Sequence, residues 1–130
     1  NIAGLSVAIT PAATSSKIWV MYNIHMTAHG TNDNFASRIA RGGTGIGVAD
    51  SEGSCVLASA VDGGWNSNVR FSNSSINFLD SPSSTSELTY TVQWVSPDTA
   101  VLYLNNPVDT VTTSNRIRTV STITVMEVLV

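Results

Sequence analysis

The stretch from Lys17 to Thr27 constrains the fold more than any other part of the sequence, because apolar side chains recur along it at every second position. One side of this expected strand is apolar throughout and consists of Ile18, Val20, Tyr22, Ile24 and Met26. We predict that this side faces the core. The other side carries Lys17, Trp19, Met21, Asn23, His25 and Thr27. Trp19 and Met21 make it too apolar for bulk water, so we expect it to meet a second layer or another subunit.

The rest of the chain is rich in β-branched residues and has no long stretch of helical periodicity. We expect further strands over residues 4–9, 35–41, 45–49, 54–60, 69–79, 87–95, 100–104 and 116–129. Turn-forming residues separate these segments at intervals of about 8–12 residues, a spacing typical of all-β sandwiches and barrels. We therefore predict one antiparallel β-sandwich of jelly-roll type over residues 1–130.

The composition narrows the class of protein. Only 12% of the 130 residues are charged, about half the usual share, and Ser, Thr and Asn take their place. Such a surface suits extracellular or virion proteins that bury part of their outside against copies of themselves. Six Lys and Arg residues argue against nucleic acid as a partner, and no apolar run is long enough to span a membrane. The chain starts with Asn1 and not Met, so we expect it to be a piece of a longer polypeptide.

Two local patterns resemble known ligand sites but favour ordinary structure. His25 and His29 lie four residues apart where a strand ends. Three copies of His25 on a symmetry axis would surround an ion, but no acidic or Cys ligand is near in the sequence, so we predict no metal and no cofactor. The glycine-rich residues 42–47 lack the ending of a phosphate-binding loop and have no helix after them, which indicates a hairpin.

The reactive side chains do not form a recognisable catalytic motif. Five carboxylates fall in expected turns, where Asp usually caps the backbone: Asp33, Asp50, Glu52, Asp62 and Asp80. A glycosidase needs two carboxyl groups that converge in one cleft, and neither histidine belongs to a nucleophile motif. We predict that the protein is not an enzyme and keep hydrolysis of a cell-surface polysaccharide as a less favoured alternative. Cys55, the only cysteine, is expected to be a buried, inert thiol.

The loop from residue 62 to residue 68 is the main binding candidate. It contains a tryptophan among glycines, amides and a carboxylate, namely Asp62, Trp65, Asn66 and Asn68. An aromatic face can stack on a sugar ring while amides and carboxylates bind its hydroxyl groups. The alternative is that Trp65 folds back over the end of the sandwich. Asn32 and Asp33, in the loop over residues 28–34, are a second candidate.

Three stretches occur in an order that resembles one known family. They are ITPAATSSKI (residues 9–18), SINFLDSPSSTSELTY (residues 75–90) and STITVMEV (residues 121–128). In these the chain resembles the C-terminal domains of tail-fibre and other virion proteins of tailed bacteriophages, including many from cyanophages.

The resemblance implies a homotrimeric β-rich head on the virion surface, which binds a bacterial surface glycan or protein and has no enzymatic activity. In such a trimer we expect Trp19, Met21 and His25 to lie in the interface between subunits. The alternative is a capsid decoration protein, whose ligand would be the capsid lattice.

Overall fold

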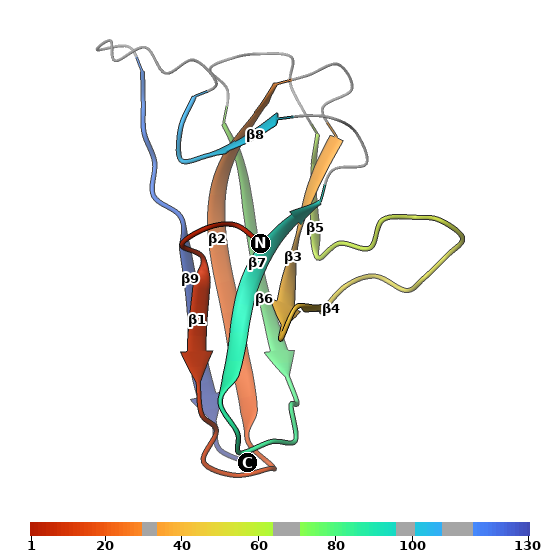
Figure 1. Cartoon of the computed structure of the whole chain (residues 1–130), viewed down its shortest axis with the longest axis vertical. Helices are drawn as coiled ribbons and strands as arrows, with labels where there is room; N and C mark the ends of the chain where they lie inside the picture. Colours follow the sequence, from red (N-terminus) through yellow and green to blue (C-terminus); the bar gives the residue numbers. More distant parts are fainter. Residues whose placement is uncertain (30–33, 64–70, 96–100, 108–115) are drawn as a thin grey trace.

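The computed structural model describes residues 1–29, 34–63, 71–95, 101–107 and 116–130. These residues contain no helix, and therefore none that is long and apolar enough to cross a membrane. Their strands are β1 (Ser6–Ile9), β2 (Lys17–His29), β3 (Asn34–Arg41), β4 (Thr44–Ile46), β5 (Ala60–Gly63), β6 (Ser72–Asp80), β7 (Leu88–Val95), β8 (Val101–Leu104) and β9 (Thr122–Val128). The strands form two antiparallel sheets that lie one behind the other in Figure 1. The predicted all-β, two-sheet architecture is thus confirmed.

Each sheet is built around one central strand whose edge is divided between two shorter strands. In the first sheet the order is β1-β7-β3, and β4 and β5 both pair with the remaining edge of β3. In the second sheet β2 pairs along one edge with β6. Along its other edge β2 pairs with β9 over residues 17–23 and with β8 over residues 26–29. The long strand β2 therefore organises the second sheet.

The core lies between the two sheets and contains the side of β2 that its alternation predicted. The five core-facing side chains of β2 are at most 3% exposed: Ile18, Val20, Tyr22, Ile24 and Met26. Across from them the first sheet contributes Phe35, Ile39, Tyr90 and Val92, which are also buried. Full burial of one such aliphatic side chain stabilises the fold by about 1.5–3 kcal/mol.

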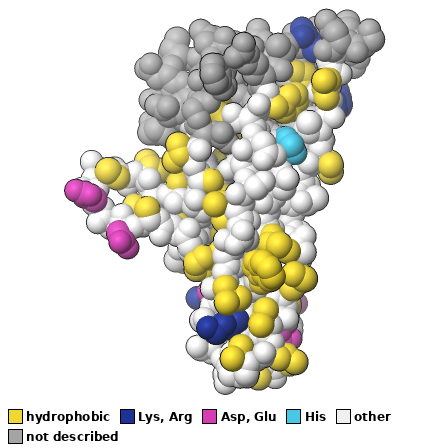
Figure 2. All heavy atoms as spheres, turned by 180° about the vertical axis from the view of Figure 1, so that it is seen from behind, with side chains coloured by type: hydrophobic (Ala, Val, Ile, Leu, Met, Phe, Trp, Pro, Cys, Tyr) yellow, Lys and Arg dark blue, Asp and Glu magenta, His cyan; other side chains and the backbone are white. Residues whose placement is uncertain are grey.

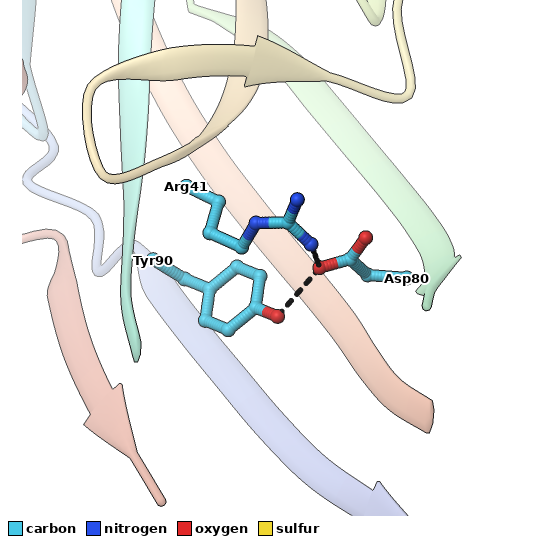
Figure 3. A network of polar contacts seen from close by, with 3 residues as sticks. All are labelled: Arg41, Asp80 and Tyr90. Carbon is cyan, nitrogen blue, oxygen red and sulfur yellow. Dashed lines mark hydrogen bonds and ion pairs between the residues drawn. The ribbon is translucent and has the colours of Figure 1, made fainter. Parts of the chain in front are cut away.

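The polar network of Arg41, Asp80 and Tyr90 joins the two sheets at the edge of this core (Figure 3), and a second one, formed by the hydroxyls of Tyr22, Ser37 and Ser74, joins them within it. Asp80, the last residue of β6, is 7% exposed, and its Oδ2 atom accepts hydrogen bonds from two residues of the first sheet. The Tyr90 hydroxyl donates at 2.6 Å and the Arg41 guanidinium at 2.5 Å. Asp80 was expected in a turn, but it ends a strand and pairs with a cation there. Burial, together with the hydrogen bond to Asp80, raises the pKa of Tyr90 well above its ordinary value.

The strand expected over residues 45–49 is shortened to β4, and the strand expected over residues 54–60 is absent apart from Ala60, which starts β5. Residues 47–59 form no strand and project from the sandwich between β4 and β5 (Figure 1). The edge of β3 is already occupied by those two strands, so the middle of the segment has no strand to pair with. Cys55 lies in this projection and is exposed, which contradicts its expected burial.

The last strand begins at Thr122, although a strand was expected from Arg116. Its ladder with β2 ends at the pair Asn23 and Thr122, because the next stretch of that edge is bound differently. The Ser121 hydroxyl accepts a hydrogen bond from the amide of His25 at 2.9 Å, and β8 pairs from Met26 onward.

Candidate binding face

The outer face of the second sheet is the surface of β6, β2 and β9 that points away from the core. Its side chains form rows across the three strands, and each row is set by the register of the ladders. The first row is Leu79, Trp19 and Met126, the second is Asn77, Met21 and Thr124, and the third is Ser75, Asn23 and Thr122. Beyond them His25 pairs with Asn73. Going along β2, the outer face therefore changes from apolar to polar.

The apolar end is a patch of four large, exposed side chains, which we call the apolar patch. It consists of Trp19, Leu79, Met126 and Val128, with exposed fractions of 40%, 49%, 43% and 37%. Figure 2, the view from behind, shows hydrophobic side chains gathered in the lower half of the molecule. A hollow of about 530 Å³ lies beside Trp19, Leu79 and Val128. Contiguous exposed apolar surface is typical of interaction sites.

The middle of the outer face holds a shallow groove, which we call the polar groove. Its volume is about 380 Å³. The second and third rows supply six of its lining residues, Met21, Asn23, Ser75, Asn77, Thr122 and Thr124, and Tyr22 and Ile76 also line it. None of these is charged. Asn77 also borders the hollow beside Trp19, so the two concave regions adjoin.

The third region of the outer face is a set of hydrogen-bonded polar side chains around Asn73. The Asn73 amide donates to Asn23 Oδ1 at 2.8 Å and lies 3.2 to 3.3 Å from the two ring nitrogens of His25. Ser75 donates to the oxygen of Asn73 at 3.2 Å. The neighbours of His25 here are amides and a hydroxyl, and no group of three metal-ligating side chains occurs among the described residues.

The three residues expected in a subunit interface do lie on this face, but in different surroundings. Trp19 is exposed within the apolar patch. Met21 is half-buried and forms part of the polar groove, while His25 is half-buried beside Asn73. Sequence reasoning identified these β2 side chains but missed Leu79, Met126 and Val128. The alternation of side chains along β6 and β9 could have shown that these three residues face outward. No sequence signal gives the register that places them beside Trp19.

Most of the residues expected to bind a receptor lie outside the described part of the chain: Asn32, Asp33, Trp65, Asn66 and Asn68. Asp62 was expected in a loop, but it belongs to β5, where it pairs with Phe35. The anchors of the two loops are nevertheless adjacent. Asn34, which starts β3, pairs with Gly63, which ends β5. Residues 30–33 and the segment that begins at residue 64 therefore attach at the same end of the first sheet.

No protein-family model matches the chain, and no curated protein or solved structure matches it. Among the described residues, the apolar patch and the polar groove are the surface features that most resemble binding sites.

Proposed function

We propose that this chain is a non-enzymatic head domain of a bacteriophage tail fibre, which sits on the virion surface and binds a receptor on the bacterial cell. The domain would be a jelly-roll sandwich that works as a homotrimer. The observation that carries the proposal is the apolar patch on the outer face of an otherwise polar, charge-poor β-sandwich.

The apolar patch supports contact between copies of the chain. Trp19 lies in register with Leu79 on one side and Met126 on the other, so the patch is continuous across three strands. Aromatic residues and Met are enriched at the centres of protein interfaces, where charged residues are rare. We propose that three subunits pack through this patch.

The loop anchors Asn34 and Gly63 support receptor binding at the end of β2 that lies away from the apolar patch. Lys17 and Trp19 lie at the start of β2, whereas residues 30–33 follow its last residue, His29. A trimer that packs through the start of β2 leaves the far ends of its subunits available to a cell surface. Three weak sites on one rigid head gain avidity without any new contact.

The described carboxylates favour binding over catalysis. Asp80 is bound by Arg41 and Tyr90, and Asp50 and Glu52 are exposed on the projecting segment. Neither arrangement supplies the two facing carboxyl groups with which a glycosidase works.

The proposal is tested by the binding of fluorescently labelled protein to candidate host cells, with and without periodate oxidation of their surface glycans. We expect saturable binding that periodate abolishes. A well-folded protein that binds no host cell but binds expanded capsids would contradict the proposal and indicate a decoration protein. Release of reducing sugar from the cells would indicate an enzyme.

A further inference from the structure

We propose that the polar groove is a binding site for a neutral glycan of two or three sugar units. This inference rests on the proposed function, because it names the class of receptor and a second place on the domain where that receptor binds. It uses only described residues and does not depend on the loops over residues 28–34 and 62–68.

The chemistry of the groove matches sugar hydroxyl groups. Its polar side chains are two amides, Asn23 and Asn77, and three hydroxyls, Ser75, Thr122 and Thr124. Amides and hydroxyls can each donate and accept hydrogen bonds, as sugar hydroxyls do. Because no charged side chain lines the groove, it offers no complementary charge to a phosphate, a carboxylate or an ammonium group. An uncharged ligand is therefore favoured.

Several of these groups are available for a ligand. Within the described part of the chain, the side chains of Asn77, Thr122 and Thr124 have no hydrogen-bond partner. Asn23 accepts one hydrogen bond from Asn73, which fixes its amide and leaves its own N–H groups to donate. The groove thus combines one oriented amide with three groups free to adjust.

The arrangement of the groove fits a ring-shaped ligand. Asn77 and Thr124 lie on either side of Met21 in one row, and strands in a sheet are about 4.8 Å apart, so the two polar groups are separated by about 10 Å. Met21 lies between them as an apolar floor against which the C–H face of a sugar can pack. The third row lies about 7 Å further along β2 and is polar throughout, with Asn23 at its centre. Two rows accommodate two or three linked rings.

The polar groove and the apolar patch are compatible in one molecule. The patch is centred on the first row, and the groove begins one row further along β2. A subunit interface confined to the patch would leave the second and third rows, and the anchors beyond them, accessible.

The experiment is a titration of isotopically labelled protein with neutral trisaccharides of glucose, mannose, galactose and N-acetylglucosamine, followed by NMR chemical shifts. We expect at least one trisaccharide to shift the signals of Asn23, Asn77 and Thr124. Asn77→Ala and Thr124→Val should each weaken its binding about fivefold or more, since each removes hydrogen-bonding groups. Thr89→Val is the matched control, because Thr89 is exposed on β7 of the other sheet and should leave binding unchanged.

Two results would overturn the inference: no trisaccharide shifts the groove signals, or the bound trisaccharide is held equally well by both groove variants. The same variants separate this inference from the proposed function. If both bind host cells as the unsubstituted protein does, and periodate still abolishes that binding, the groove is not the site although the domain still binds glycans. If the unsubstituted protein binds no host cell, the proposed function itself fails.

Discussion

The Tyr90 hydroxyl donates a hydrogen bond of 2.6 Å to Asp80, and this contact crosses from one sheet to the other. Replacing Tyr90 by Phe keeps the ring in the core but removes one of the two donors to a buried carboxylate. We expect Tyr90→Phe to lower the free energy of unfolding by about 1–3 kcal/mol, measured by urea denaturation. Tyr103→Phe is the control, with an expected change below about 0.5 kcal/mol, because Tyr103 is only half-buried at the edge strand β8. Equal effects of the two substitutions would show that the inter-sheet contact contributes nothing.

The same contact predicts how stability depends on alkaline pH. Burial, together with the hydrogen bond to Asp80, raises the pKa of Tyr90 above its ordinary value of 10.0. A group whose pKa is raised on folding gives its full contribution below the unfolded pKa, and this contribution declines as the pH rises above that value. We expect the free energy of unfolding to fall as the pH rises above about 10. In Tyr90→Phe this part of the decline should be absent, and an unchanged pH profile would contradict the assignment.

The apolar patch predicts which single substitution dissociates the proposed trimer. Trp19→Asp places a charge in the middle of the patch, where an interface would have to bury it. We expect the dissociation constant of the oligomer to rise about 30-fold or more, which corresponds to about 2 kcal/mol. Light scattering coupled to size exclusion measures the mass, and Thr89→Asp on the opposite sheet is the control. If the mass of Trp19→Asp stays unchanged at every concentration, the interface lies elsewhere.

Gly47 and Gly53 offer a matched pair of substitutions on the projecting segment. Both have positive φ values, of 58° and 57°, so an alanine at either position meets the same backbone strain. At Gly47 the added Cβ would also lie 2.7 Å from the Phe78 ring, whereas at Gly53 it would meet open space. We expect Gly53→Ala to cost about 1 kcal/mol and Gly47→Ala to cost about 1–3 kcal/mol more in thermal unfolding. Equal costs would show that Gly47 does not pack on Phe78.

The exposed thiol gives a direct check on the projecting segment. Because Cys55 is exposed, we expect a thiol reagent such as dithionitrobenzoate to react with the whole native population without denaturant. A thiol that reacts only in urea would show that residues 47–59 fold back onto the sandwich.

The alternation along Lys17–Thr27 predicted β2 and its buried side correctly, because a core on one side imposes a period of two on any strand. It also placed Trp19 on the outer side, where 40% of the residue is exposed. The alternation does not show which residue of a neighbouring strand pairs with each residue of β2. The row of Leu79, Trp19 and Met126 depends on ladders between residues about 60 and 107 positions apart, and no local pattern specifies that register.

The incorrect predictions for Cys55 and Asp80 also arise from contacts between residues that are distant in the sequence. Cys55 and Leu57 alternate like a short strand, but a strand needs a free edge, and the edge of β3 is occupied by β4 and β5. Asp80 precedes Ser81 and Pro82 and so resembles a turn residue, yet its role depends on Arg41 and Tyr90 from the other sheet. The roles of Trp65 and Asp33 in receptor binding stay predictions.

The division of one edge of β2 between β8 and β9 has a consequence for how the protein reaches its native state. The ladder between Lys17 and Val128 joins residues 111 positions apart, and the start of β2 has no other partner along that edge. During synthesis β2 therefore leaves the ribosome long before β9, and its sheet is completed only after residues 122–128 have been made. Until β9 pairs with β2, the second sheet is incomplete. Pairings between residues so far apart in the sequence form slowly. We therefore expect the pairing of β2 with β9 to limit the rate at which the second sheet folds.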